Sequence, residues 1–258
     1  MKHKALRDAR FFFTTAPMPC PYLPGLVERR LVTELAGRDA TAYHDALSRA
    51  GFRRSHGIAY VPICPDCSAC ATVRIVAAEA RRTRSQKRVW TLNQDLEVNV
   101  APARATAEQY AVFSAYQRSR HGDGDMARMD GYDYQALVED TPVNSSMLEF
   151  RDGDGRLVAA CVIDHLSDGP SAVYSFFDPE ESRRSLGTFM ILWLTEYAKA
   201  NDLSYVYLGF WVADSRKMSY KSRFQPMEAF TPGGWRELDL ESPEAKRMFA
   251  PGADRIDR

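Results

Sequence analysis

The sequence predicts an α+β protein in two parts, a smaller cysteine-containing domain over residues 1–100 and a larger domain over residues 101–258. Three observations support this prediction. The chain has 258 residues, 45% of them hydrophobic, and can bury one large core or two modest ones. The first part is rich in Pro, Arg and Cys. The second part alternates strand-like and helix-like patterns in the order strand, strand, strand, helix, strand, helix, strand.

The individual elements follow from periodicity and turn residues. In the first part, a helical pattern over residues 40–50 ends at Gly51, and two apolar runs at 58–63 and 71–76 predict strands on either side of a cysteine-rich segment. The second part opens with a predicted helix at 101–121. A hairpin follows, because the turn DGDG joins two strand patterns. We expect strands at 146–151, 156–165, 171–177 and 204–210, helices at about 185–200 and 216–222, and one or two final strands.

The net charge favours no particular partner, because 34 basic residues balance 34 acidic ones. One segment differs, since residues 81–88 hold five basic side chains and no acidic one. Such a segment can hold a phosphate backbone, because counterion release depends on the local patch; a solvated charged surface is the alternative. The start of the chain lacks the apolar run of a secretory signal, and the apolar stretch at 189–194 is too short to span a membrane. We expect a cytoplasmic protein with no membrane partner.

The chain has five cysteines, and three of them, Cys64, Cys67 and Cys70, stand at every third position. In a reducing compartment, such a trio binds metal or stays free more often than it forms disulfides. With Cys20 as a fourth ligand it can hold zinc or an iron–sulfur cluster, and free thiols are the alternative. Cys161 lies in an apolar run and is expected to be a small buried side chain.

The order of elements in the second part resembles the GNAT acyltransferase superfamily, in which a strand–loop–helix unit presents backbone amides to a pyrophosphate. Arg184 and Gly187 fit the R-x-x-G-x-G/A loop of that superfamily, but Phe189 stands where Gly or Ala is usual. The resemblance implies that Phe189 would crowd the pyrophosphate of coenzyme A. Residues 218–224 are similar to the last helix of the superfamily, whose tyrosine protonates the leaving group in many members.

Eight motifs in collinear order, within a resemblance that covers about residues 8 to 236, look like those of the aminoacyl-tRNA–protein transferase family. The similarity is closest to its short bacterial branch, the aspartate/glutamate leucyltransferases. The motifs are CPYLPG at 20–25, GFRRS at 51–55, YVPIC at 60–64, SQKR at 85–88, YSFFDP at 174–179, SLG at 185–187, YLGFW at 207–211 and KMSYK at 217–221.

The resemblance implies an enzyme that moves leucine from leucyl-tRNA to the N-terminal α-amine of proteins that begin with Asp or Glu, in the N-degron pathway of protein degradation. An α-amine has a pKa of about 8, so a useful fraction is already neutral and no strong base is needed. We expect the chemistry to require no cofactor. The alternatives are an arginyl-tRNA donor, an acetyl-CoA-dependent N-acetyltransferase and a non-catalytic nucleic-acid-binding protein. An arginyl donor needs a carboxylate in its pocket and a leucyl donor an apolar pocket. Composition does not choose between them, and it leaves the oligomeric state open.

The resemblance also implies residue roles. Arg53, Arg54 and Arg74 are candidates for binding the acidic N-terminal residue, because a guanidinium suits a carboxylate. In catalysis, the strand around Ser175 can stabilise the oxyanion through backbone N–H groups, Tyr220 can protonate the departing ribose oxygen, and Asp178 can orient the amine. The predicted tRNA-binding residues are Arg81, Arg82, Arg84, Lys87, Arg88, Arg183, Arg184, Gly187, Lys217 and Lys221. Plain structural roles, such as a core tyrosine, a strand terminator or a solvated helix face, are the alternatives.

Overall fold

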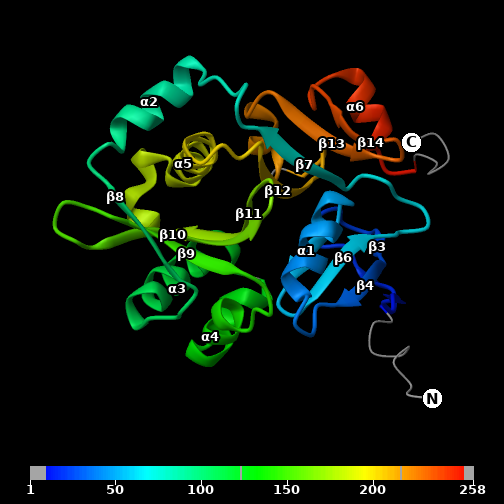
Figure 1. Ribbon diagram of the computed structural model, residues 1–258, viewed down its shortest axis with the longest axis horizontal. Coiled ribbons are helices and arrows are strands. Elements are labelled where there is room, and N and C mark those ends of the chain that lie inside the picture. Colours follow the sequence, from blue (N-terminus) through cyan, green and yellow to red (C-terminus); the bar gives the residue numbers. More distant parts are fainter. Residues whose placement is uncertain (1–9, 123, 216, 253–258) are drawn as a thin grey trace.

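The computed structural model describes residues 10–122, 124–215 and 217–252. Its centre is an eight-stranded mixed sheet of strand order β14-β13-β7-β12-β11-β10-β9-β8 (Figure 1). The strands are β7 (Ala71–Val76), β8 (Glu97–Pro102), β9 (Ser145–Arg151), β10 (Leu157–Leu166), β11 (Gly169–Phe177), β12 (Tyr205–Trp211), β13 (Met227–Thr231) and β14 (Gly234–Glu237).

The N-terminal strands form two smaller sheets. One has the order β1-β4-β6-β5 and the other pairs β2 with β3. Their bounds are β1 Phe13–Thr14, β2 Met18–Pro19, β3 Val27–Glu28, β4 Arg30–Glu34, β5 Arg53–Ser55 and β6 Ile58–Pro62. The helices are α1 (Ala40–Arg49), α2 (Arg84–Leu92), α3 (Ala107–His121), α4 (Gly131–Glu139), α5 (Leu186–Ala200) and α6 (Pro243–Met248), with 3-10 turns η1 (Asp125–Arg128), η2 (Pro179–Arg184) and η3 (Ser219–Arg223).

Helices cover both faces of the large sheet. In Figure 1, α2 and α5 lie on one side of β9 and β10, and α3 and α4 lie on the other. The strands alternate accordingly: Leu148 and Phe150 of β9 pack in the cluster with α5, while Met147 packs with Phe113 of α3. Since β10 is covered on both faces, nearly every residue in it is buried, which explains its continuous apolar sequence.

The topology confirms the predicted fold class. The strands β9, β10 and β11 form an antiparallel meander, and α5 then crosses over to β12, which runs parallel to β11. This is the strand, strand, strand, helix, strand order expected from the sequence, in an α+β, GNAT-like arrangement. The predicted helices at 40–50 and 185–200, the hairpin and the strands at 58–63 and 71–76 are all present within one or two residues.

Three features differ from the sequence prediction. The large sheet crosses the predicted boundary at residue 100, because β7 and β8 pair with β12 and β9. The strand β8 and the helices α2 and α4 were not predicted. The helix expected from residue 101 begins at Ala107, because β8 occupies residues 97–102 and Thr106 caps the N-terminus of the helix. The last predicted helix is a short 3-10 turn, and Arg216 in its expected range lies outside the described residues.

Candidate active site

A cavity of about 670 Å³ lies where β11 and β12 separate. The two strands are parallel neighbours, but their ladder has one register pair, Ser171 with Tyr207, near the start of both. Beyond it the strands diverge, and residues of β11, β12, the first half of α5 and η3 line the opening. Arg53 from β5 and Arg120 from α3 complete the wall, so the site draws on elements far apart in the sequence.

One edge of β11 points into this opening. The N–H of Asp178 donates to the carbonyl of Val158 at 2.8 Å, in line with the register pair of Phe176 and Ala160. The even-numbered residues at this end of β11 therefore bond to β10. Because successive backbone groups of a strand point in opposite directions, the N–H of Ser175 points into the cavity. It provides a backbone donor with no strand opposite it.

On the other side, β12 has a bulge at Leu208, since its pairing with β7 shifts register between Tyr207 and Gly209. Gly209 has a φ of 70°, where a side chain is strained, and a Cβ there would lie 3.0 Å from Nη1 of Arg53. The absence of a side chain lets the Arg53 guanidinium pass the strand. Its Nη2 donates to the carbonyl of Val173 on β11 at 2.8 Å, so Arg53 bridges the two separated strands.

Lys221 of η3 is buried beside the same opening. Its Nζ donates to the carbonyls of Leu208 and Phe210 at 2.7 and 2.6 Å and lies 3.9 Å from Sδ of Met218. The Lys221 side chain thus donates to carbonyls of β12 beside the gap where β11 has turned away. Desolvation lowers the pKa of Lys221 well below its ordinary value, and the nearby charge of Arg53 lowers this pKa further.

The N-terminus of α5 faces the cavity through Gly187 and Thr188. Ser185, with a φ of 52°, turns the chain sharply from η2 into this 15-residue helix. The first N–H groups of a helix lack intrahelical partners and carry partial positive charge, so they bind phosphate and other anions. A phosphate group can therefore approach the cavity at this corner.

The charge of the cavity wall has one sign. Four basic side chains line it, Arg53, Arg120, Lys217 and the buried Lys221, and no lining residue in the described part of the chain is Asp or Glu. The deeper walls are apolar. The cavity can therefore accept an anionic group near its cations and an uncharged one against its walls.

The three arginines predicted to bind an acidic residue have different surroundings. Arg53 lines the cavity and has no carboxylate partner among the described residues. Arg54, its neighbour on β5, is buried in a two-bond ion pair with Asp164 at 2.7 and 2.8 Å. Arg74 is likewise engaged, by Glu228 at 2.7 Å and by stacking against aromatic rings. Only Arg53 of the three faces the site.

Two of the three predicted catalytic residues line the cavity. Ser175 does so on β11, and Tyr220 does so from η3, with 38% of its surface exposed. Burial of the ring raises the pKa of Tyr220 to about 12, so its hydroxyl stays protonated at neutral pH. Asp178 is not among the lining residues. It caps η2 by accepting the N–H of Glu180 at 2.9 Å and pairs with Arg156 at 2.6 Å, which fits the role of a strand terminator.

The predicted tRNA-binding residues form three groups. Gly187, Lys217 and Lys221 line the cavity, although Lys221 is buried and bonded to backbone carbonyls. The segment 81–88 lies at the start of α2, where Arg81, Arg84, Lys87 and Arg88 are exposed. Arg82 is partly buried over Trp90 and pairs with Glu196 of α5. Arg183 is exposed, and Arg184 is held by Asp95 and Glu181.

One expectation about the loop before α5 is wrong. The Phe189 ring does not line the cavity but packs in the core, 5.5 Å from Trp90 and 5.8 Å from Phe150 between ring centroids. It therefore leaves the phosphate corner open. Two site residues were not predicted, Gly209 and Arg120. A glycine inside the strand motif YLGFW is a recognisable bulge signal, whereas Arg120 is one of several basic residues at the end of α3 and carries no such signal.

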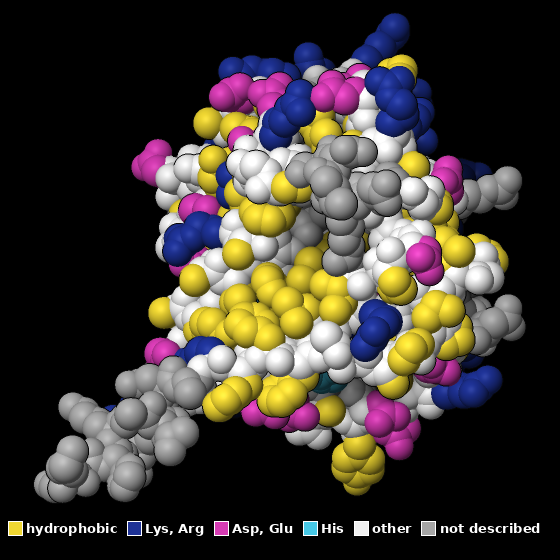
Figure 2. All heavy atoms as spheres, turned by 90° about the vertical axis from the view of Figure 1, so that its right-hand side faces the viewer, with side chains coloured by type: hydrophobic (Ala, Val, Ile, Leu, Met, Phe, Trp, Pro, Cys, Tyr) yellow, Lys and Arg dark blue, Asp and Glu magenta, His cyan; other side chains and the backbone are white. Residues whose placement is uncertain are grey.

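The predicted metal ligands gather in a second cavity of about 230 Å³, lined by Cys20, Cys64, Cys67 and Cys70. Burial and the neighbouring thiols raise the pKa of Cys70 to about 12, which opposes formation of the thiolate that a metal needs. Within the described ranges, no group of three or more Cys, His, Asp or Glu has the arrangement of a metal site. Metal binding by these four cysteines therefore stays a prediction. Figure 2 shows apolar side chains gathered on the side of the molecule that faces right in Figure 1.

A parallel strand pair that separates beside a helix N-terminus, with a backbone donor facing the gap, is the arrangement expected of the GNAT-like fold. Both parts of the chain match family descriptions: arginine-tRNA-protein transferase, N terminus, at residues 18–88, and the C terminus of the same family at 108–231. Proteins named aspartate/glutamate leucyltransferase are similar over nearly the full length. The one from Paramagnetospirillum magneticum is 56% identical over 98% of this chain and 99% of its own, and the one from Granulibacter bethesdensis 52% over 97% and 96%. The chain belongs to the aminoacyl-tRNA–protein transferase family, in its aspartate/glutamate leucyltransferase branch, and is an enzyme.

Solved structures share a more distant likeness. L-PGS from Bacillus licheniformis matches with a TM-score of 0.44 and 10% identity, over 69% of this chain and 51% of that one. FemX matches with a TM-score of 0.41 and 9% identity, over 70% of this chain and 63% of its own. Among the described helices, none has the length and apolar character needed to cross a membrane.

Proposed function

We propose that this protein transfers leucine from leucyl-tRNA to the α-amino group of proteins whose first residue is Asp or Glu. The observation that carries the proposal is the cavity between β11 and β12, which has cations and apolar walls and no carboxylate among its described lining residues. Its chemistry suits an acidic acceptor and an uncharged donor side chain. The names of the relatives that match nearly the full chain agree with this reaction.

The chemistry requires positioning more than a strong base. The neutral α-amine attacks the ester carbonyl, the new C–N bond forms, and the C–O bond to the ribose then breaks. The N–H of Ser175, which points into the cavity, donates to the oxyanion of the tetrahedral intermediate. Tyr220 gives a proton to the departing ribose oxygen and regains one from the attacking nitrogen. No metal or other cofactor takes part in these steps.

Arg53 is our candidate for reading the acidic first residue. Its guanidinium donates one N–H to Val173 and has further donors for a carboxylate, which it can bind in two places at once. Arg54 and Arg74 act differently, because their carboxylate partners lie within the protein and fix the position of β5 and β7. The acceptor peptide would therefore enter on the side of the cavity nearest β5.

The tRNA is expected to approach along α5. Its terminal phosphates would meet the N–H groups around Gly187 and the exposed Lys217. The segment 81–88 lies beside α5 at a point farther from the cavity, because Arg82 pairs with Glu196 of that helix. Glu196 is nine residues beyond Gly187, or roughly 14 Å at 1.5 Å per residue. A basic segment at that distance suits the acceptor stem and not a second contact with the terminal nucleotide. Because aminoacyl-tRNA is the donor, we place the reaction in the cytoplasm.

The function is tested with purified protein, radiolabelled leucyl-tRNA or arginyl-tRNA, and peptides that begin with Asp, Glu or Ala. We expect leucine on the Asp and Glu peptides only, and little transfer from arginyl-tRNA, because the cavity offers a guanidinium no carboxylate. Transfer of arginine in place of leucine would reassign the donor. Acetylation of the peptides by acetyl-CoA, with no transfer from either tRNA, would overturn the proposal. A product that begins with leucine is the form of protein that the N-degron pathway degrades.

A further inference from the structure

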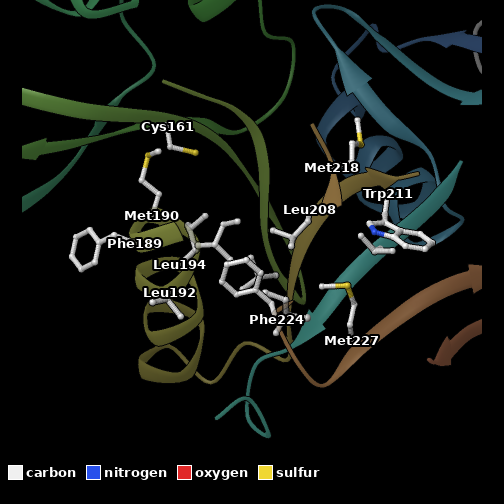
Figure 3. Packing of buried hydrophobic residues seen from close by; sticks show 14 of the residues in the cluster. Cys161, Phe189, Met190, Leu192, Leu194, Leu208, Trp211, Met218, Phe224 and Met227 are labelled. Atoms are coloured by element: carbon white, nitrogen blue, oxygen red, sulfur yellow. The ribbon is translucent and has the colours of Figure 1, made fainter. Parts of the chain in front are cut away.

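The deep wall of the cavity is built from uncharged side chains of four elements. Gly187, Met190, Ile191 and Leu194 repeat at helical spacing and present one face of α5 to the cavity. Opposite this face lie Cys161 of β10, Leu208 of β12 and Met218, which precedes η3. In Figure 3, the sulfur ends of Cys161 and Met190 lie near each other, and Leu208 extends from β12 toward α5.

The strand geometry places this wall beside the reacting bond. Cys161 is the register partner of Ser175, whose N–H faces the cavity. Leu208 is the extra residue of the bulge on β12, and a bulge redirects the side chain it carries. An ester carbonyl bound at Ser175 would therefore have its α-carbon, and the side chain on it, next to these residues.

The wall also lacks hydrogen-bond acceptors for a cationic side chain. The carbonyls of Leu208 and Phe210 are the acceptors of β12 next to the gap, and both already accept a hydrogen bond from Nζ of Lys221. Burial holds the Cys161 thiol in its neutral form, since it raises the pKa of Cys161 to about 12. A guanidinium placed here would be desolvated without partners, which is costly, whereas an isobutyl group would be accommodated.

We propose that Cys161, Met190, Ile191, Leu194, Leu208 and Met218 form the subsite for the side chain of the transferred amino acid, and that Lys221 excludes cationic donors by occupying the two carbonyls there. This inference rests on the proposed function, because it takes leucyl-tRNA to be the donor. Methionine and cysteine side chains adapt in shape, so we take Ile191, Leu194 and Leu208 to set the size of the subsite.

A pair of equally buried leucines tests the subsite. Leu208 and Leu192 are each 4% exposed, but Leu208 lines the cavity and Leu192, which lies on α5, does not. The full-length variants Leu208→Ala and Leu192→Ala remove the same atoms. The readout is the ratio of kcat/KM for phenylalanyl-tRNA over leucyl-tRNA, with a peptide that begins with Asp as acceptor.

We expect Leu208→Ala to raise this ratio by tenfold or more, since enlarging an apolar pocket by a few methylenes changes discrimination by that order. Leu192→Ala should leave the ratio within twofold of the unaltered protein. If Leu208→Ala does not fold, Ile191→Ala against Leu192→Ala makes the same comparison. Equal ratios in the cavity variant and its control would overturn the subsite while leucyl transfer by the unaltered protein still upheld the proposed function. Absence of leucyl transfer by the unaltered protein would reject both.

Discussion

Replacing Arg53 with glutamine is the sharpest test of how the enzyme selects its acceptor. The guanidinium occupies the space beside Gly209 that a side chain there would fill, donates to Val173 and keeps its remaining donors for the cavity. Glutamine has an amide of similar polarity but no charge, and it cannot bind a carboxylate through two parallel N–H groups. The change should therefore weaken recognition of Asp and Glu and affect neutral first residues little.

The expected magnitude follows from the kind of bond that is lost. A hydrogen bond to a charged group contributes about 1.5–3 kcal/mol when its loss leaves a partner unsatisfied. At 1.36 kcal/mol per factor of ten, this range corresponds to a loss of about 10- to 150-fold in kcat/KM. The attraction is not offset by a protein carboxylate, because none lies among the described residues that line the cavity.

The assay compares leucyl transfer to two peptides that differ only in their first residue, Asp or Asn. For the unaltered protein, the Asp peptide should have much the higher kcat/KM, and Arg53→Gln should reduce the Asp-to-Asn ratio by about 10- to 150-fold. Arg236→Gln is the matched control, because Arg236 is exposed and pairs with Glu244 outside the cavity. An unchanged ratio in Arg53→Gln, with a general fall in activity, would mean that Arg53 only braces the strands and that another group reads the carboxylate.

Three further predictions concern Lys221, Gly209 and the basic segment. Because the pKa of Lys221 is lowered in the native protein, the unfolded chain binds more protons than the native one below pH 10.5, the ordinary pKa of a lysine. The free energy of unfolding should therefore rise with pH up to that value, by at most about 1.4 kcal/mol per pH unit. Lys221→Met should remove this slope in urea denaturation at several pH values; an identical slope would show that the group titrates normally. Gly209→Ala should lower the free energy of unfolding by about 1–2 kcal/mol, because a side chain is strained at its positive φ, and should also lower selectivity for Asp by displacing Arg53. Gly155→Ala is the control, because Gly155 has a φ of 80° and open space around it, so this variant should lose stability without a change in selectivity. Replacing Arg81, Arg82 and Arg84 together by Ala should weaken tRNA binding and make its dependence on salt shallower by about two to three units of logarithmic slope; affinity unchanged at every salt concentration would count against a tRNA contact there.

Much of the fold could be predicted because its signals are local. The DGDG turn, the apolar run of β10 and the helical pattern of α5 each follow from neighbouring residues, and together they predicted the order of the acyltransferase core. The strand β8 was missed because it lies at an exposed sheet edge, where its residues need no apolar alternation. Its pairing with β9 decides that it is a strand, and this partner begins more than forty residues later.

For the candidate site too, local signals predicted one part, and the other part depends on residues far apart in the sequence. The motifs alone indicated the region around Ser175, Gly187 and Tyr220, because backbone geometry and loop length determine where these residues lie. They did not distinguish Arg53 from Arg54, since adjacent residues of a strand face opposite sides and the sequence does not say which side is the cavity. The ion pair between Arg54 and Asp164, 110 residues apart, decides that Arg54 is neutralised and that Arg53 is the arginine facing the cavity. Lys221 illustrates the same limit, because its motif suggested a surface cation.

The sequence by itself determined the family, the order of the elements and the motifs around the candidate site, since these depend on residues close to one another along the chain. Only the tertiary structure decided which charges remain available. Arg54 and Arg74 are engaged by carboxylates that the fold brings from distant strands, Lys221 is held by carbonyls of β12, and Arg53 reaches the cavity past Gly209. The physical reason is that pairing and burial, which control the chemistry of a charged side chain, depend on neighbours in space and not on neighbours in sequence.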